Sequence, residues 1–329
     1  MGIKVGIPRG LLYFYYYPLW ERFFRSLGVE IVLSTATSRP IFNRGIVLAN
    51  DETCLPVKVF YGHVEELKNK NVDYIFLPRM ISMEKDTYLC PKLLGFPEVI
   101  TTGIPNLPPV LTVNFNLRKD SREMDEALSK LGKQLGFGNK EIKHAIKAGV
   151  GAQTEFERLL QSGQEYEIAL KGRGVEKTGE TPQLKIGVLG HAYLLYDGFT
   201  SLDLRTKLHK LGVKVVMPES IAQEDIDKQL QVLPKKLFWS HSKRILGAGF
   251  DLIQDDSVDG LIHITCFGCG PDSMVGDMVE RACRKQGKAF MMLTLDEHTG
   301  EAGLITRLEA YIDMLKRRVQ VEDNVSAHG

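Results

Sequence analysis

The sequence predicts an α/β protein with two parallel-sheet domains that are related by internal duplication and joined by a helical connection. Short apolar strands alternate with amphipathic helices along most of the chain, which is typical of parallel sheets covered by helices. In addition, the phrase SLGVEIV at 26–32 returns as KLGVKVV at 210–216. The repeated phrase indicates that one structural unit occurs twice.

Each copy of this unit has the same predicted order of elements. The first begins with a strand over 3–7, continues with a helix over 17–27 and enters a second strand over 29–33. The second copy begins with a strand over 185–190 and repeats that order. In both copies a glycine ends the helix, where a C-cap requires a positive φ, and a β-branched run follows. We therefore expect the same fold in both halves.

The domain boundaries follow from changes in composition. We expect a first domain over 1–115, a helical connection and linker over 116–183, and a second domain with a C-terminal helix over 184–329. The connection is rich in Glu, Lys, Leu and Ala at helical spacing. Its last part, Lys171–Gln183, contains three glycines and a proline and is typical of a linker.

Charge and hydropathy exclude several classes of function. The 329 residues include 42 Lys and Arg against 41 Asp and Glu, so no basic surplus favours nucleic acid as a partner. No apolar run is long enough to span a bilayer, and the first residues predict a strand instead of a signal peptide. We therefore expect a cytoplasmic protein. Five cysteines, an odd number in a reducing compartment, favour ligands or buried thiols over disulfides.

Four of the five cysteines lie in predicted loops beside proline or glycine. Cys54 and Cys90 belong to the first half, and Cys266 and Cys269 form a C-x-x-C motif directly after a strand in the second half. Loops at the carboxyl ends of parallel strands lie at the ligand-binding edge of a sheet. Cys283 differs, because it falls inside a predicted helix and is expected to be a buried thiol.

Three interpretations of the four loop cysteines remain open. Zinc fits the count, although zinc sites usually use two compact cysteine pairs and only one is present. A thioredoxin-like redox pair explains Cys266 and Cys269 but leaves Cys54 and Cys90 unused. An iron–sulfur cluster accepts thiolates from separate segments and is favoured by the Cys-Pro and Cys-Gly-Pro contexts. We therefore predict one [4Fe-4S] cluster ligated by these four cysteines.

Four motifs resemble the activase-related proteins of the 2-hydroxyacyl-CoA dehydratase and benzoyl-CoA reductase superfamily, a group near the double-cubane cluster proteins. They are GIPRGL at 6–11, DETCLPVK at 51–58, CPK at 90–92 and FGCGPDS at 267–273. The resemblance implies two Rossmann-like domains facing each other across a cleft, with an iron–sulfur cluster inside. It also implies a partner, an ATP-dependent activase with its own cluster, and a larger dehydratase-like subunit is a further candidate partner.

The resemblance leaves more than one function open. Catalytic subunits of this group typically hold their cluster with three cysteines and leave one iron open, whereas four cysteines here favour electron transfer. The alternative is a reductase or dehydratase that acts on a CoA-linked or small substrate at an open iron. A metal-free receptor of the periplasmic-binding type is a third hypothesis. The chain has no Gly-Lys-Ser/Thr phosphate loop, so ATP hydrolysis is expected of the partner.

Residues beside these loops are secondary candidates. His191, Tyr193 and Tyr196 follow the first strand of the second half, in the place of the tyrosine cluster at 13–17 in the first half. The acidic and histidine group at 296–298 is either close to the cluster or a helix cap.

Overall fold

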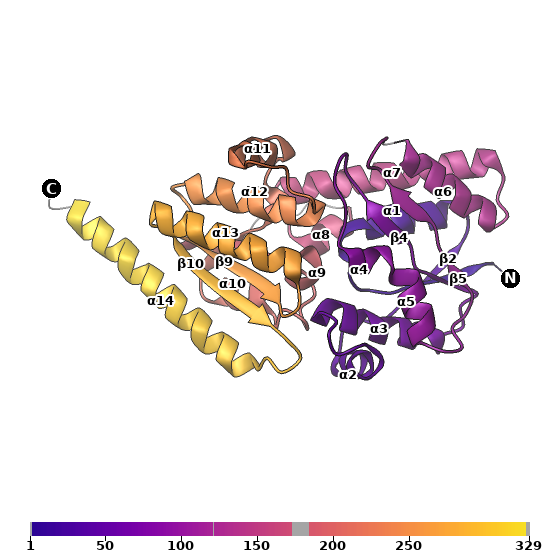
Figure 1. The fold of residues 1–329 in the computed structure, drawn as a ribbon, viewed down its shortest axis with the longest axis horizontal. Coiled ribbons are helices and arrows are strands. Elements are labelled where there is room, and N and C mark those ends of the chain that lie inside the picture. The colour runs from indigo at the N-terminus through magenta and orange to yellow at the C-terminus, as the bar shows by residue number, and fades with distance from the viewer. Residues whose placement is uncertain (1, 121, 173–183, 327–329) are drawn as a thin grey trace. The chain divides into compact units, whose positions relative to one another are not determined.

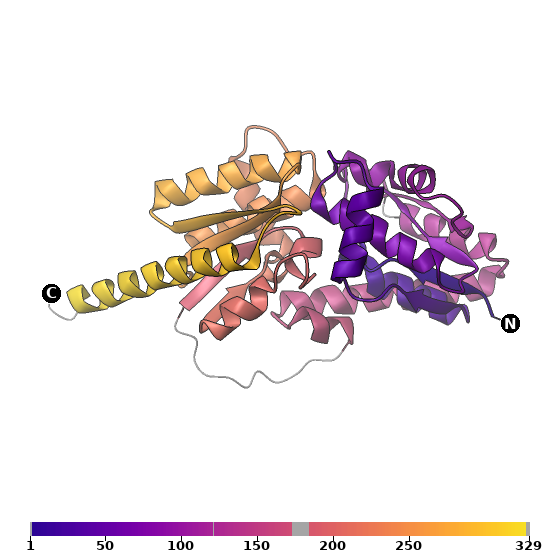
Figure 2. The same ribbon diagram turned by 90° about the horizontal axis from the view of Figure 1, so that it is seen from below.

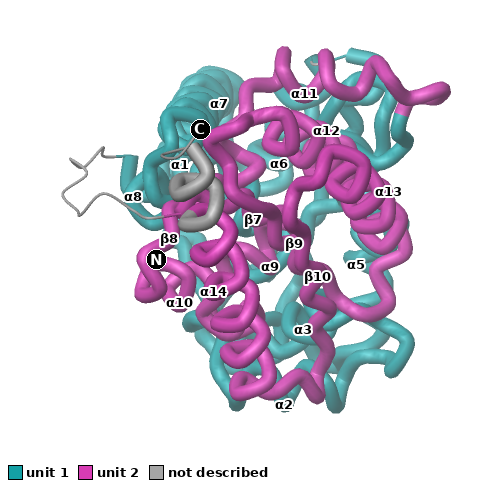
Figure 3. Tube along the Cα trace, turned by 90° about the vertical axis from the view of Figure 1, so that its left-hand side faces the viewer, with its two compact units in different colours: residues 1–174, 237–241 teal, residues 175–236, 242–329 magenta. Residues whose placement is uncertain are grey.

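The computed structural model describes residues 2–120, 122–172 and 184–326 (Figure 1). The chain forms two compact units, one of residues 1–174 and 237–241 and the other of residues 175–236 and 242–329 (Figure 3). The predicted linker lies outside the described residues except for its first two, and the boundaries at 115 and 183 stay a prediction. Among the described helices, none combines the length and the apolar character needed to cross a bilayer.

A four-stranded parallel sheet forms the centre of the first unit. Its strands lie in the order β2-β1-β3-β5, with a separate parallel pair β4-β6. Their bounds are β1 Lys4–Ile7, β2 Glu30–Leu33, β3 Tyr74–Phe76, β4 Arg79–Ser82, β5 Val110–Leu111 and β6 Asn114–Asn116. The apolar residues of β1 and β3 are buried, which is why these short runs form the middle of the sheet.

The helices of the first unit are α1 Tyr13–Ser26, α2 Arg39–Leu48, α3 Leu55–Lys68, α4 Pro91–Leu94, α5 Phe96–Gly103, α6 Glu123–Gln134, α7 Asn139–Gln161 and α8 Tyr166–Leu170. Helix α1 begins at Tyr13, four residues before the predicted start. The tyrosine cluster is therefore helical, and Tyr13 and Tyr17 are buried and tilted against each other at 4.6 Å. Helices α6, α7 and α8 lie in the described part of the predicted connection, and α7 packs on α1 through Gly149, where a Cβ would lie 2.9 Å from the carbonyl oxygen of Leu19.

Two glycines bring α2 and α3 into backbone contact. A Cβ at Gly45 would clash with the carbonyl oxygen of Lys58, and a Cβ at Gly62 would clash with that of Ile41. Only glycine permits so close an approach of two helices. This contact fixes α3, which begins directly after Cys54.

The second unit also has a four-stranded parallel sheet, in the order β10-β9-β7-β8. Its strands are β7 Leu184–Leu189, β8 Val213–Val216, β9 Gly260–Cys266 and β10 Ala289–Leu295. All seven residues of β9 are buried. The helices are α9 Ala192–Leu195, α10 Leu204–Lys210, α11 Gln223–Gln229, α12 Ser240–Gln254, α13 Gly270–Gln286 and α14 Glu301–Ser326, with 3-10 turns η1 Pro218–Ser220 and η2 Leu230–Val232. Helices α13 and α14 lie on opposite sides of this sheet (Figure 2).

The predicted α/β class with parallel sheets is confirmed. When only the strands of each four-stranded sheet are counted in chain order, both sheets have the spatial order second, first, third, fourth. Descent of the two units from one duplicated ancestor stays a prediction. In such a sheet the loops after the first and third strands lead to opposite faces, so the crevice between them is the expected ligand site.

Candidate metal centre

The C-x-x-C motif forms a tight turn at the end of β9. Cys266 is the last residue of that strand and is 4% exposed. The backbone N–H of Cys269 donates to the carbonyl oxygen of Cys266 at 3.2 Å, and Gly268 has a φ of 79°. A positive φ at the third position of a four-residue turn requires glycine or asparagine. Gly268 thus allows both thiols to lie on one short loop, and Cys269 becomes the N-cap residue of α13.

His191 approaches this loop from the neighbouring strand. It follows Gly190 at the end of β7, and it is the N-cap residue of α9. A Cβ at Gly190 would lie 2.7 Å from both the carbonyl oxygen and a side-chain carbon of Ile264, so only glycine fits between the two strands. The buried imidazole of His191 stacks on the ring of Tyr193 at 4.9 Å. The backbone therefore holds the imidazole beside the end of β9.

Asp272 and His263 form a fully buried pair beneath the loop. The Nε2 atom of His263, on β9, lies 3.1 Å from Oδ1 of Asp272, in the first turn of α13, and both side chains are 0% exposed. Gly276 leaves room for the imidazole, because a Cβ there would lie 3.2 Å from Nδ1 of His263. Burial raises the pKa of Asp272, but His191 and His263 outweigh this effect and hold the pKa below its usual value. Asp272 is therefore a buried carboxylate.

Three side chains converge at this point. Ligand atoms of His191, Cys269 and Asp272 lie within 4.8 Å of one another. The group lies between the carboxyl ends of β7 and β9, which is the place where the connections of this sheet reverse direction. Ligands of open parallel sheets bind at that crevice. The arrangement thus joins a thiol, an imidazole and a carboxylate at the expected site of the second unit.

The thiol of Cys269 is acidic in this setting. A hydrogen bond with Cys266 is the largest cause that lowers the pKa of Cys269, and His191 adds a hydrogen bond and a charge. Burial and Asp272 oppose them, and the resulting pKa is about 5. Cys269 is therefore a thiolate at neutral pH, the form that binds metals and attacks electrophiles. By contrast, burial raises the pKa of Cys283 to about 12, and this thiol is fully buried in α13 as predicted.

The two cysteines of the first unit also lie at helix starts. Cys54 is the N-cap residue of α3 and Cys90 is the N-cap residue of α4, and each helix has a proline within its first two residues. Both cysteines are partly exposed, and none of the chain's five cysteines, all of which lie in the described part, forms a disulfide. The structure thus brings Cys266 and Cys269 together, while common ligation by all four cysteines stays a prediction.

A returning segment supports the loop that carries Cys90. Residues 237–241 belong to the first unit although the chain on either side of them belongs to the second. The N–H of Tyr88 donates to Phe238 at 2.9 Å, the N–H of Ser240 donates to Tyr88 at 3.0 Å, and the rings of Tyr88 and Phe238 stack at 4.7 Å. The backbone at Tyr88, two residues before Cys90, is therefore held by hydrogen bonds to the returning segment.

A histidine also lies near the carboxyl end of β2 in the first unit, but its surroundings differ. His63 is buried, with Nδ1 at 2.9 Å from the hydroxyl of Ser34 and Nε2 at 3.0 Å from that of Thr37. Burial lowers the pKa of His63 to about 3. The ring is therefore neutral and connects hydroxyl groups instead of facing a carboxylate.

The acidic and histidine group at 296–298, a further candidate from the sequence, forms a cap. Asp296 accepts hydrogen bonds from the N–H of His298 at 2.9 Å and the hydroxyl of Thr299 at 2.8 Å, so it caps the turn before α14. Asp272 and His263 were not predicted as site residues from the sequence. Two features of the sequence could have indicated them: a histidine inside an otherwise apolar strand, and an acidic residue three positions after the second cysteine.

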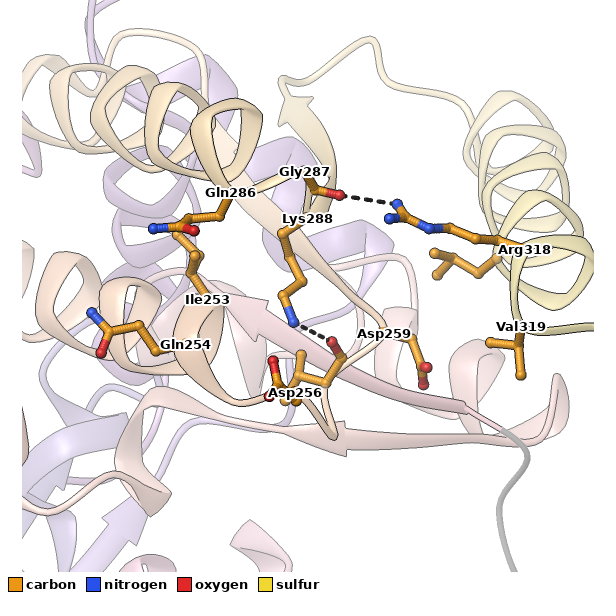
Figure 4. A pocket seen from close by; sticks show the side chains of 11 residues that line it. Ile253, Gln254, Asp256, Asp259, Gln286, Gly287, Lys288, Arg318 and Val319 are labelled. Atoms are coloured by element: carbon orange, nitrogen blue, oxygen red, sulfur yellow. Dashed lines mark hydrogen bonds between the residues drawn. The ribbon is translucent and has the colours of Figure 1, made fainter. Parts of the chain in front are cut away.

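A pocket of about 560 Å³ lies at the opposite edge of the same sheet (Figure 4). Its lining includes Asp259 just before β9 and Lys288 just before β10, so it opens at the amino ends of the strands. The ammonium group of Lys288 donates to the carbonyl oxygens of Asp255 and Val258, and Arg318 donates to that of Gly287. These cations bind backbone carbonyls, and the pocket does not include the cysteine loop.

Comparison with known proteins identifies a family and also gives a weak structural similarity. The family model described as "CoA enzyme activase uncharacterised domain" matches residues 4–221, about two thirds of the chain, which include Cys54 and Cys90. A solved carbohydrate transporter from Acidothermus cellulolyticus 11B, in complex with myo-inositol, is 12% identical and covers 90% of this chain and 74% of its own, with a TM-score of 0.20. That TM-score carries no argument. No curated protein matches the chain.

Proposed function

Because this chain belongs to the family of the CoA enzyme activase uncharacterised domain, we propose that it has an activase-type role in electron transfer. It holds one [4Fe-4S] cluster through Cys54, Cys90, Cys266 and Cys269. Its partner is an ATP-dependent activase of the 2-hydroxyacyl-CoA dehydratase type, and it works in the cytoplasm, where thiols stay reduced.

The position of the cysteines at helix starts supports this proposal most directly. Cys54 and Cys269 are the N-cap residues of helices of 14 and 17 residues, and Cys90 has the same position before the short α4. The N-terminus of a helix carries a partial positive charge and unpaired N–H groups. Both stabilise a thiolate and the negative charge of an iron–sulfur cluster.

The donor set fits the cluster in chemistry and count. Four thiols match the four ligands of a [4Fe-4S] cluster, which supplies one-electron transfer when bound. The turn at Gly268 presents Cys266 and Cys269 as a chelating pair, and Cys266 hydrogen-bonds the sulfur of Cys269. Hydrogen bonds to ligand sulfurs and burial are the means by which a protein adjusts the potential of a cluster.

The test is anaerobic reconstitution of the full chain with iron and sulfide. We expect about four irons and four sulfides per chain, a broad absorption in the visible blue, and an electron paramagnetic resonance signal after reduction. Cys90→Ala should lose most of the iron, whereas Cys283→Ala should keep it. A wild-type chain without iron and sulfide would refute the proposal, and a signal altered by an added acyl-CoA would favour an open iron instead.

A further inference from the structure

The buried carboxylate of Asp272 has one oxygen that His263 does not contact. Oδ1 faces His263, whereas Oδ2 is buried and forms no well-aligned hydrogen bond with any described residue; the nearby hydroxyl of Thr265, which has no other partner among them, helps to lower the pKa of Asp272. A fully buried carboxylate is costly unless hydrogen bonds or a metal satisfy its oxygens. The side chain is 0% exposed, so solvent does not provide that partner. Asp272 is therefore a candidate ligand for an ion.

The distances in this group suit one common ion. Zinc binds a cysteine sulfur at about 2.3 Å and a histidine nitrogen at about 2.1 Å, so in a tetrahedral site two such ligand atoms lie about 3.6 Å apart. The ligand atoms of His191, Cys269 and Asp272 lie within 4.8 Å of one another. Shifts of up to about 1 Å, within the range of side-chain rotation, therefore bring the three atoms to the spacing of ligands on one ion.

We propose that the second unit binds one thiophilic divalent cation, Zn²⁺ or Fe²⁺, through His191, Cys269 and Asp272, without any ligand from the first unit. Thiolate and imidazole select such metals over Mg²⁺ and Ca²⁺. Three protein ligands leave a fourth position for water or a small ligand. The cation and the cluster share Cys269, so they are alternative occupants of this loop.

Neighbouring side chains hold the candidate metal ligands in place. The imidazole of His263 fixes the orientation of the Asp272 carboxylate, and Cys266 hydrogen-bonds Cys269. Partners of this kind orient metal ligands, and their loss typically lowers metal affinity about 10- to 100-fold. The pair of His263 and Asp272 is otherwise unexplained by a cluster that uses cysteines alone.

The experiment removes the first unit's cysteines and asks whether metal still binds. The full chain with Cys54→Ala and Cys90→Ala is purified anaerobically, stripped with a chelator and titrated with Co²⁺, a spectroscopic substitute for Zn²⁺. We expect one equivalent of Co²⁺ and a sulfur-to-cobalt charge-transfer band that Cys269→Ala abolishes. His191→Ala and Asp272→Asn should each weaken binding by more than about 10-fold, and His263→Asn by about 10- to 100-fold.

Two substitutions serve as matched controls. Asp277→Asn, an exposed position on the same helix, and Cys283→Ala should leave Co²⁺ affinity unchanged. Unchanged affinity in both His191→Ala and Asp272→Asn would overturn the proposal, and so would the absence of Co²⁺ binding in the double variant. If Asp272→Asn does not fold, X-ray absorption spectroscopy of the Zn²⁺-loaded double variant identifies the atoms that bind the metal. One sulfur with nitrogen or oxygen ligands supports the site, and two sulfurs contradict it.

The outcome is separable from that of the proposed cluster. The cluster requires Cys54 and Cys90, whereas the cation site does not. A double variant that binds Co²⁺, in a protein whose wild type fails to form a cluster, would refute the cluster alone. A wild type that forms the cluster, with a double variant that binds no Co²⁺, would refute the cation site alone.

Discussion

The two sheets have the same strand order, but a buried histidine in each unit has different surroundings. In the first unit His63 lies between the hydroxyls of Ser34 and Thr37. In the second unit His263 faces the carboxylate of Asp272, which lies close to Cys269 and His191. The first network satisfies its own polar atoms, whereas in the second the Oδ2 atom of Asp272 forms no well-aligned hydrogen bond within the described part of the chain. The first arrangement lies away from the cysteines of its unit, and the second lies within the group of three candidate metal ligands.

The difference shows that chemistry in this fold depends on the loops and not on the sheet. A shared strand order places a crevice at the same position in each unit, but the residues after each strand decide what it binds. In the second unit, Gly190 and Gly268 bring His191 and the cysteine pair to the crevice. In the first unit, the cysteines lie at the starts of α3 and α4 instead.

Removing Asp272 should have the largest effect on stability. Asp272→Ala leaves His263 buried without its partner, and loss of one member of a buried pair typically costs about 3–5 kcal/mol. Ser34→Ala removes one of the two hydrogen bonds of His63 and should cost about 1–3 kcal/mol. Denaturant unfolding of the metal-free variants measures both. Equal costs would mean that the two histidine networks do not differ as described.

The next largest loss of stability is expected from a substitution of Gly62, at the contact of α2 and α3. Gly62→Ala places a methyl group against the backbone of Ile41, which cannot move aside, so we expect a loss of about 1–3 kcal/mol and a shift of α3. Gly276→Ala in the second unit should cost less, because its nearest neighbour is the flexible end of Met292.

The control for both glycine substitutions is Gly151→Ala, on the exposed side of α7. A Cβ there meets nothing within 4 Å, so the change should stabilise the protein by about 0.5–1 kcal/mol. Chemical denaturation ranks the three variants. A Gly62→Ala variant as stable as the control would contradict the close contact of α2 and α3.

A further expectation is a pH dependence of the first unit. The pKa of His63 is about 3 in the folded state against 6.5 as its ordinary value, so only the unfolded state binds this proton between these values. Stability is therefore complete above pH 6.5 and falls toward pH 3, by at most about 1.4 kcal/mol per pH unit. His63→Asn should reduce this slope, and His144→Asn, at an exposed position, should not. Identical slopes in wild type and His63→Asn would exclude the buried neutral histidine.

Much of the fold could be predicted from the sequence, because its signals are local. The Gly28 and Gly212 positions have φ values of 76° and 77°, as their place after each helix predicted. The strands predicted over 3–7 and 185–190 agree within one residue with β1 and β7. The start of α1 was predicted too late, because aromatic residues that pack inside the unit do not show a helical start in the sequence.

The candidate site was predictable only in part. The contexts of Cys266 and Cys269 marked the loop, and the order of elements marked His191. Asp272 and His263 lie close together only because β9 and α13 pack on each other, and sequence spacing does not reveal such a contact. The α2–α3 contact was missed for the same reason, since a glycine in a helix does not indicate what it touches.

The central proposal is that Cys54, Cys90, Cys266 and Cys269 together hold one iron–sulfur cluster. It is tested most directly by the iron and sulfide content of Cys54→Ala and Cys269→Ala after the same anaerobic reconstitution, with Cys283→Ala as the control. We predict that both site variants lose the cluster to the same extent, while the control keeps about four irons and four sulfides per chain. A Cys54→Ala variant that keeps a full cluster, beside a Cys269→Ala variant that loses it, would contradict the claim.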